Sequence, residues 1–453
     1  MLFSRRNLFN IILPLIIQQT LNVMVGMIDS MMVASAGEAV VSGVSLVNTL
    51  DVLLINLFSA LVTGGAVVVS QYLGKKDMYL VRNSSKQLIY VATGFATLLS
   101  LIVLIIRLPL LSLLFGHVAT DVMRSAQDYF FYIALSFPVL ALYTAGTALF
   151  QSMGNSFIPM LISLLTNVIN VFGNALLIYG FHMGAAGAAI ATLLARGVGA
   201  VIIVILLHNK KNVIYIERLW HYKPNFRIIK DILRLGVPTG IESSMFHFGK
   251  LLTQSLISSM GTAAIAANAV AHNMATFQYM PGNAIGLATT TIVGRCIGAK
   301  EKEQAKKYAK ILLGITYVCL WIVVLITCLF SKQIIGLFNL SATASEIANK
   351  LIIYHALVAA IIWPIAFALP SSFKAASDVK FTLWVSLFSM WVFRVAIGYV
   401  FAFKDIPLFG TSIPGLGLGI FGVWFAMTVD WVFRTILFAY RYLSGKWLTK
   451  YKG

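Results

Sequence analysis

Residues 8–33 read LFNIILPLIIQQTLNVMVGMIDSMMV and contain a single charged side chain, Asp29. A helix needs about 20 apolar residues to cross the hydrocarbon core of a bilayer, which is roughly 30 Å thick. The run is too long for the apolar region of a cleavable signal peptide, and it lies just after Arg5 and Arg6. It therefore predicts a first membrane-spanning helix that is not removed.

Apolar runs of similar length recur along all 453 residues, of which 59% are hydrophobic and only 11% charged. Soluble domains average about 25% charged residues, so the composition indicates a membrane protein. Twelve spans are predicted, near residues 8–33, 44–72, 87–106, 127–150, 158–180, 184–207, 235–258, 267–294, 309–330, 351–372, 381–403 and 418–440.

The net charge of +19 is distributed unevenly between the two sides of these spans. Most of the 34 lysines and arginines fall in alternate loops and at the two ends of the chain, as Lys75, Lys76, Lys210 and Lys211 do. Cytoplasmic loops carry such an excess of basic residues. The charge therefore predicts a multi-pass protein of the cell membrane with both termini cytoplasmic, and no nucleic-acid partner.

The chain also resembles itself when it is shifted by 224 residues, so two halves of six spans each are predicted. The coinciding pairs include Pro14 and Pro238, Gly37 and Gly261, Val69 and Val293, Gly74 and Gly298, and Lys76 and Lys300. Gly184-x-x-Gly187 later matches Gly419-x-x-Gly422, after a longer loop in the second half.

Six is an even number, so both halves enter the membrane from the same side and are parallel repeats. The predicted fold is an all-α integral membrane protein with twelve transmembrane helices in two lobes around a central cavity. The predicted limits are 1–207 for the N-lobe, 208–233 for a cytoplasmic linker and 234–453 for the C-lobe with a short cytoplasmic tail.

Asp29 is the first candidate for a functional site, because an ionisable residue within a membrane span is costly to insert. Its neighbours are apolar, which allows its carboxyl to exchange a proton or another cation. The alternative is an aspartate near the outer end of the helix that simply reaches water.

Asn167, Asn170 and Asn174 recur on one helical face of the fifth predicted span. Their amides can ligate a hard cation beside Asp29 or hydrogen-bond its protonated form. They can equally hold helices together, as asparagines in membrane helices often do. Thr192 in the sixth span is a weaker candidate, because its hydroxyl can bond to its own helix.

Glu242, Asp51 and Lys250, together with Asn167, are secondary polar candidates for substrate contact. Glu242 could attract a cationic substrate or form an ion pair with Lys250, eight residues along the same span. Asp51 has no evident local partner. Asp430 lies four residues before Arg434 and is predicted to pair with it. Arg196 and Arg394 are predicted to be structural.

Several motifs together resemble the multidrug and toxic compound extrusion (MATE) family, bacterial type, over essentially the whole chain. They are Pro14 and Pro238 in the first span of each half, Gly-x-x-Gly in the sixth, VGMIDSMMV around Asp29, and the span ends V69SQYLG74 and V293GRCIG298. The resemblance implies a V-shaped exporter of organic cations or drugs that alternates between outward- and inward-open states.

The resemblance further implies sodium- or proton-coupled antiport, with Asp29 as the coupling acid and Asn170, Asn174 and Thr192 around it. No cofactor, catalytic residue or metal centre is expected beyond the coupling Na⁺ or H⁺, and the chain is not expected to be an enzyme. A monomer is expected in the lipid bilayer. The alternatives are a lipid-linked precursor flippase of the same superfamily and a non-transporting membrane scaffold.

Overall fold

The computed structural model describes residues 3–217, 223–338, 340–408 and 411–451, with side chains outside 406–413. The chain forms two compact units by its internal contacts. The N-terminal unit comprises residues 1–240 and 298–300, and the C-terminal unit comprises residues 241–297 and 301–453. The division falls inside one long helix, α7 (Phe226–Ser258).

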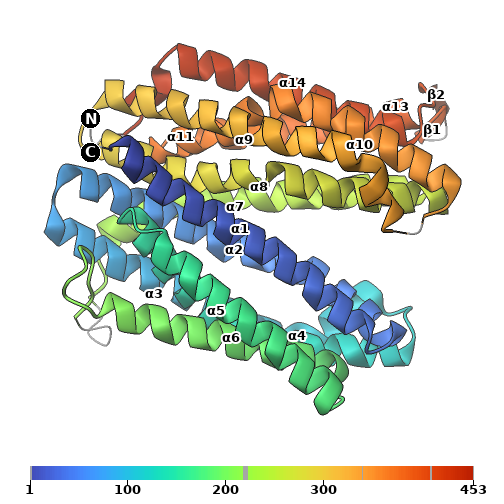
Figure 1. Cartoon of the computed structure of the whole chain (residues 1–453), viewed down its shortest axis with the longest axis horizontal. Helices are drawn as coiled ribbons and strands as arrows, with labels where there is room; N and C mark the ends of the chain where they lie inside the picture. Colours follow the sequence, from blue (N-terminus) through green and yellow to red (C-terminus); the bar gives the residue numbers. More distant parts are fainter. Residues whose placement is uncertain (1–2, 218–222, 339, 409–410, 452–453) are drawn as a thin grey trace. The chain divides into compact units, whose positions relative to one another are not determined.

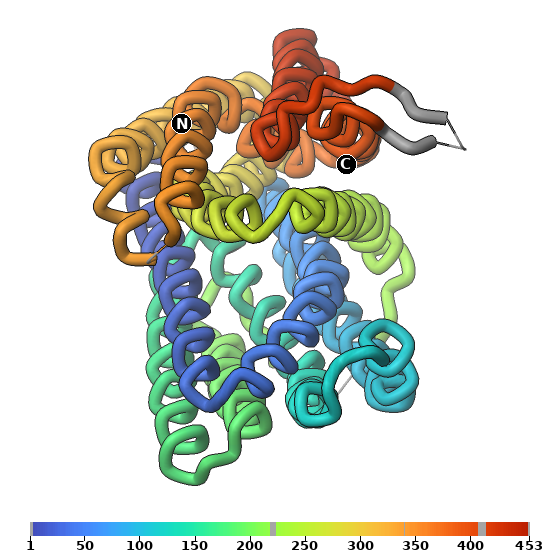
Figure 2. The backbone as a smooth tube through the Cα atoms, turned by 90° about the vertical axis from the view of Figure 1, so that its right-hand side faces the viewer, coloured from blue at the N-terminus to red at the C-terminus, as the bar shows by residue number. Residues whose placement is uncertain are grey.

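The N-terminal unit contains six long helices that run side by side, and Figures 1 and 2 show them in blue to green from two directions. They are α1 (Arg5–Ala34), α2 (Glu38–Lys75), α3 (Met78–Phe115), α4 (Thr120–Ser152), α5 (Phe157–Asn174) with the π-helical segment η1 (Ala175–Gly180), and α6 (Gly184–Leu207). The buried core of this unit includes Phe58, Phe130 and Phe137 from α2 and α4.

The C-terminal unit is helical as well, with two of its helices interrupted by π-helical segments. Its elements after α7 are α8 (Thr262–Gly298), α9 (Lys302–Gly336), α10 (Ala342–Trp363) with η2 (Pro364–Ala368) and α11 (Pro370–Ala375), α12 (Val379–Phe388) with η3 (Ser389–Ala396) and α13 (Ile397–Ala402), α14 (Ile420–Leu443) and the short 3₁₀ helix η4 (Lys446–Thr449).

Ten helices in the described part of the chain are long and apolar enough to cross a membrane. The helices α7 and α8 are less apolar, but with 33 and 37 residues they too exceed the length of a span. Together they give the twelve segments that the sequence predicts. The interior of α7 carries Glu242, His247 and Lys250, which explains its low hydropathy.

One departure from the all-α prediction is a small antiparallel hairpin, β1 (Asp405–Leu408) and β2 (Thr411–Pro414), in which Asp405 pairs with Pro414 and Leu408 with Thr411. It occupies the longer loop of the second half, between α13 and α14. The residues of this longer loop belong to neither flanking helix, so their backbone groups pair with one another in a local hairpin.

The backbone repeats the duplication that the sequence shows. Residues with positive φ recur at matching places in the two halves, where the helices begin or end. The matching pairs are Gly37 (φ 120°) and Gly261 (97°), Lys76 (61°) and Lys300 (62°), and Gly184 (52°) and Gly419 (59°). Turns with a positive φ at matching positions therefore connect corresponding helices in each half.

The repeated Gly-x-x-Gly motif has a different physical reason at each glycine. The first glycine, Gly184 or Gly419, adopts a positive φ that other residues rarely take. The second glycine permits a close helix approach: a Cβ on Gly422 would lie 2.4 Å from the backbone oxygen of Phe401. A Cβ on Gly187 would lie 3.2 Å from the carbonyl carbon of Leu177.

Gly422→Ala is expected to destabilise the protein, because the obstructing atom belongs to the backbone of α13 and cannot rotate away. Overpacking of this kind costs about 1–3 kcal/mol. The measurement is the temperature at which detergent-purified protein loses its monodisperse elution. Gly314→Ala on α9 is the matched control, since a Cβ there meets nothing within 4 Å. Equal midpoints for the two variants would contradict the packing account.

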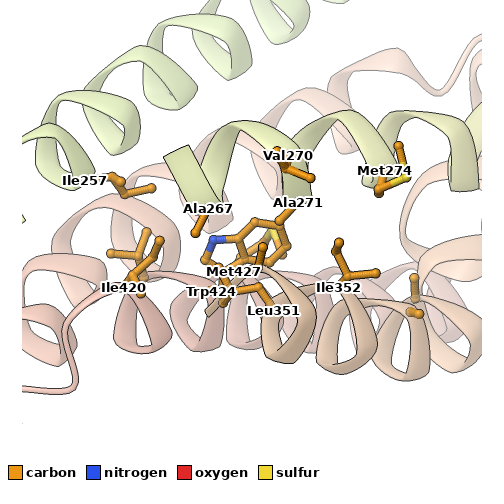
Figure 3. Close-up of a cluster of buried hydrophobic side chains, with 14 of the residues drawn as sticks. Ile257, Ala267, Val270, Ala271, Met274, Leu351, Ile352, Ile420, Trp424 and Met427 are labelled. Atoms are coloured by element: carbon orange, nitrogen blue, oxygen red, sulfur yellow. The ribbon is translucent and has the colours of Figure 1, made fainter. Parts of the chain in front are cut away.

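The core of the C-terminal unit lies between α8, α10 and α14. Figure 3 shows Trp424 of α14 beside Ala267 and Ala271 of α8, with Leu351 of α10 close by. The Trp424 indole nitrogen donates to Asn268 Oδ1 at 3.0 Å, so the one polar atom of this side chain is satisfied. A mainly aliphatic core with buried tryptophans therefore packs together the helices of this unit.

Candidate functional site

Asp29 lies near the end of α1 and contacts polar side chains of α5. The Asn174 amide nitrogen donates to Asp29 Oδ1 at 2.7 Å. Asp29 is half-buried, whereas Asn174 is almost fully buried. The aspartate is thus held by a neighbouring helix rather than free at a helix end.

Asn170 lies one turn before Asn174, and its amide also faces Asp29. When the amide nitrogen of Asn170 faces the carboxylate, it donates to Asp29 Oδ1 at 2.7 Å and to Asp29 Oδ2 at 3.0 Å. The Asn170 amide oxygen then accepts from Thr192 Oγ1 at 3.2 Å. The Thr192 hydroxyl also lies 2.9 Å from the Ala188 carbonyl oxygen of its own helix, α6, so its single proton is shared between the two acceptors. Three helices therefore meet around one carboxylate.

The local helix geometry explains this arrangement. Asn170 and Asn174 are one turn apart, so both amides point to the same side of α5. The π-helical segment η1 begins at Ala175, directly after Asn174, and π-helical turns are frequent at functional sites. Asn167 lies on the same face, but its buried amide nitrogen has no hydrogen-bond partner among the described residues.

The chemistry of this group suits a cation or a proton. Asn174 Oδ1 is buried and has no hydrogen-bond partner among the described residues, although its amide nitrogen is engaged by Asp29. The Asp29 carboxylate contacts the amides of Asn170 and Asn174, Thr192 contacts Asn170, and the Asn170 amide can turn its oxygen toward Asp29 by rotating. Oxygen ligands of these types bind hard cations.

Asp51 is the second acid of the N-terminal unit. It is buried on α2, with 7% of its surface exposed, and its Oδ1 has no hydrogen-bond partner among the described residues. Arg196 interacts electrostatically with both Asp51 and Asp29, and its Nη1 donates to Ser136 Oγ at 2.6 Å. Asp51 is therefore a second buried carboxyl, separate from the hydrogen bonds that the described residues make around Asp29.

Glu242 forms an ion pair, but not the one considered from the sequence. Its Oε2 lies 3.0 Å from Lys374 Nζ of α11, and it also accepts from Ser386 at 3.0 Å and Thr382 at 3.3 Å. The alternative pairing with Lys250 is wrong, because eight residues along a helix separate the two by about 12 Å. The one sequence feature that could have pointed to Lys374 is that it is a basic residue at the end of a predicted span.

Asp430 pairs with Arg434 as the i,i+4 spacing predicts, with Arg434 Nε 2.8 Å from Asp430 Oδ1. Both side chains are buried. Asp430 also accepts a hydrogen bond from the Ser389 hydroxyl of η3. Lys250 on α7 does not join this ion pair in the described part of the chain, and its ammonium lies over the Phe246 ring, 5.2 Å from the centroid.

Curated proteins with similar sequences are transporters of the same length. YisQ of Bacillus subtilis (strain 168), an uncharacterized transporter, is 26% identical, over 98% of this chain and 95% of its own. A probable multidrug resistance protein NorM from Thermotoga maritima is 25% identical, over 98% and 93%.

A solved structure shows the same fold. The outward-facing conformation of a multidrug resistance MATE family transporter of the MOP superfamily superposes with a TM-score of 0.87, over 98% of this chain and 96% of that one, at 20% identity. This confirms the predicted class of all-α membrane protein with two repeats.

The MatE family model matches the chain twice, over residues 14–176 and 238–400. The second match begins 224 residues after the first, which is the offset of the internal repeat. The two matches cover well over half of the chain. This chain therefore belongs to the MatE family of membrane transporters, and it is not an enzyme.

Proposed function

We propose that the protein is a secondary active exporter of organic cations and drugs, driven by the inward movement of Na⁺ or H⁺. The observation that carries the coupling part is the Asp29 group, in which amides from α5 face a carboxylate on α1. Membership of the MatE family and relatives named as probable multidrug resistance proteins support the export of drugs.

The proposed coupling uses the two orientations of the Asn170 amide. Facing the ionised Asp29, the amide nitrogen donates to the carboxylate. When Asp29 takes up a proton or a metal cation, the amide turns and offers its oxygen, which accepts from the protonated acid or ligates the cation. This turn also changes the contact with Thr192, so cation binding alters the packing between α1, α5 and α6.

In this mechanism the cation reaches Asp29 from outside, and the changed packing weakens the hold on the substrate, which leaves outward. Movement of one positive charge inward provides about 2.3 kcal/mol per 100 mV of membrane potential. That free energy sustains an outward substrate gradient while the transporter alternates in access between the two sides.

The proposed location and domain organisation of the exporter rest on its charge distribution and its internal sequence repeat. The excess of basic residues in alternate loops supports a plasma-membrane protein with both termini in the cytoplasm. The proposed domains are an N-lobe over 1–207, a linker over 208–233 and a C-lobe over 234–453, where residues 218–222 lie outside the described part of the chain. The protein acts as a monomer, with no nucleic-acid partner.

Ethidium efflux from cells that express the protein tests this function, with sodium and proton gradients imposed separately. Efflux that follows one gradient, and collapses when that gradient is removed, is the expected result and identifies the ion. Protein present in the membrane without efflux under either gradient would contradict the proposal. Such a result would favour a flippase of the same superfamily or a non-transporting scaffold.

A further inference from the structure

Three cationic side chains of the C-terminal unit surround one phenylalanine ring. Lys250 Nζ lies 5.2 Å from the centroid of Phe246, and the guanidinium carbons of Arg394 and Arg434 lie 5.6 Å and 5.3 Å from it. The three cations come from α7, η3 and α14. We call Lys250, Arg394, Arg434 and Phe246 the basic cluster.

One carboxylate, Asp430, lies within ion-pair distance of this cluster among the described residues. Its Oδ1 accepts from Arg434 Nε at 2.8 Å, and it also binds Ser389. Arg394 Nη1 is 3.9 Å from Asp430 Oδ2, beyond hydrogen-bond distance. Asp430 thus pairs closely with Arg434 through Oδ1 and more loosely with Arg394 through Oδ2, an oxygen without a hydrogen-bond partner among the described residues.

Lys250 forms no ion pair in the described part of the chain, and Arg394 shares the Asp430 carboxylate with Arg434. Arg394 is 8% exposed, and its buried Nε has no hydrogen-bond partner. Cation–π contacts with Phe246 attract a cation but do not neutralise its charge. The other acid of the region, Glu242, is already paired with Lys374. Three positive charges therefore share one carboxylate in an apolar interior, which leaves an excess of positive charge that a bound anion would offset.

The side chains around the basic cluster are aromatic. Phe246 packs against Phe367 with centroids 6.0 Å apart, and Phe367 in turn contacts Trp363 and Trp431. On the next residues of α7, Phe248 packs against Trp391 of η3. Such surroundings favour a ligand with a flat apolar body.

We propose that Lys250 and Arg394 bind the anionic group of an aromatic ligand, such as a carboxylate or sulfonate, whose ring packs beside Phe246. Arg394 presents a planar guanidinium, and its unpartnered Nε gives it a free donor. Lys250 adds a mobile point charge on the other helix. As a statement about transport, this inference rests on the proposed function: the exporter accepts aromatic anions or zwitterions as well as cations.

Equilibrium binding to the purified full-length chain tests the inference with two probes of similar shape. Naphthalene-2-sulfonate carries the anionic group, and naphthalene-2-sulfonamide is its neutral analogue. We expect the wild-type protein to bind the sulfonate at least about tenfold more tightly than the sulfonamide. We expect Lys250→Met to weaken sulfonate binding about tenfold and to leave sulfonamide binding unchanged.

Two further variants control for folding and for general charge. Lys250→Arg keeps the charge and is expected to retain the preference for the sulfonate. Lys332→Met removes an exposed lysine of α9 in the same unit and is expected to have no effect. Equal wild-type affinities for the two probes would overturn the inference even if Lys250→Met failed to fold. Unchanged sulfonate binding in a folded Lys250→Met protein would overturn it as well.

A lipid phosphate offers the same anionic chemistry as a small ligand, and a competition arm separates the two sources. Phosphatidylglycerol that displaces the sulfonate equally from wild type and from Lys332→Met does not act through the exposed lysine, and this result assigns the basic cluster to a lipid headgroup. Sulfonate binding that persists in the presence of phosphatidylglycerol assigns the basic cluster to small aromatic anions. Ethidium efflux tests the proposed function separately, so each can fail without the other.

Discussion

Asp29→Asn is expected to abolish ion-driven efflux in a protein that still folds. The substitution preserves the size of the side chain and its ability to hydrogen-bond Asn174 and Asn170. It removes the negative charge that attracts a cation and the carboxyl group that takes up a proton. Efflux of ethidium from proteoliposomes under the driving gradient should therefore fall at least about tenfold, to the level of vesicles without protein.

Two aspartates of the same unit provide matched controls for this loss. Asp121→Asn changes an exposed acid in the first turn of α4 and should leave efflux unchanged. Asp51→Asn changes the other buried acid of the unit, whose Oδ1 lacks a hydrogen-bond partner among the described residues. Ion-driven efflux at the wild-type rate in Asp29→Asn would contradict the coupling role, and loss in Asp51→Asn alone would transfer that role to Asp51.

Much of the fold could be predicted from the sequence because a membrane imposes a simple rule on it. Each span needs a long apolar run, and a duplication repeats the same landmarks, such as Pro14 and Pro238, at one offset. Twelve segments and the two halves followed from these patterns. The hairpin between α13 and α14 did not, because a short local pairing leaves no periodic signal in a loop of 17 residues between Ala402 and Ile420.

The candidate site was predictable where its residues share one helix or differ from their surroundings. Asp29 stands out as a lone acid in an apolar run, and the asparagines of α5 share one face. Contacts between distant helices were not predictable: nothing local to Glu242 indicates Lys374, which is 132 positions further along the chain. Side-chain packing also decided that Asn170 and Asn174 reach Asp29 while no such contact is seen for Asn167.

Asp430→Asn is expected to be the most destabilising charge change in the C-terminal unit. Asp430 is fully buried and accepts from Arg434 and Ser389. Neutralising it leaves the guanidinium of Arg434, 3% exposed, without a counter-charge in an apolar interior. Breaking one partner of a buried ion pair costs about 3–5 kcal/mol. The loss is measured as a lower thermal midpoint of elution for the detergent-purified protein.

The same unit offers a control pair with the same spacing along a helix. Glu346 and Lys350 are also four residues apart, with 2.7 Å between their charged atoms, but both side chains are largely exposed. Water screens this pair and solvates whichever partner is left, so Glu346→Gln should leave the midpoint almost unchanged. Because spacing and distance are alike in the two pairs, a large difference between the variants isolates burial as the cause. Equal midpoints for Asp430→Asn and Glu346→Gln would mean that Arg434 finds another partner, or water, once the carboxylate is gone.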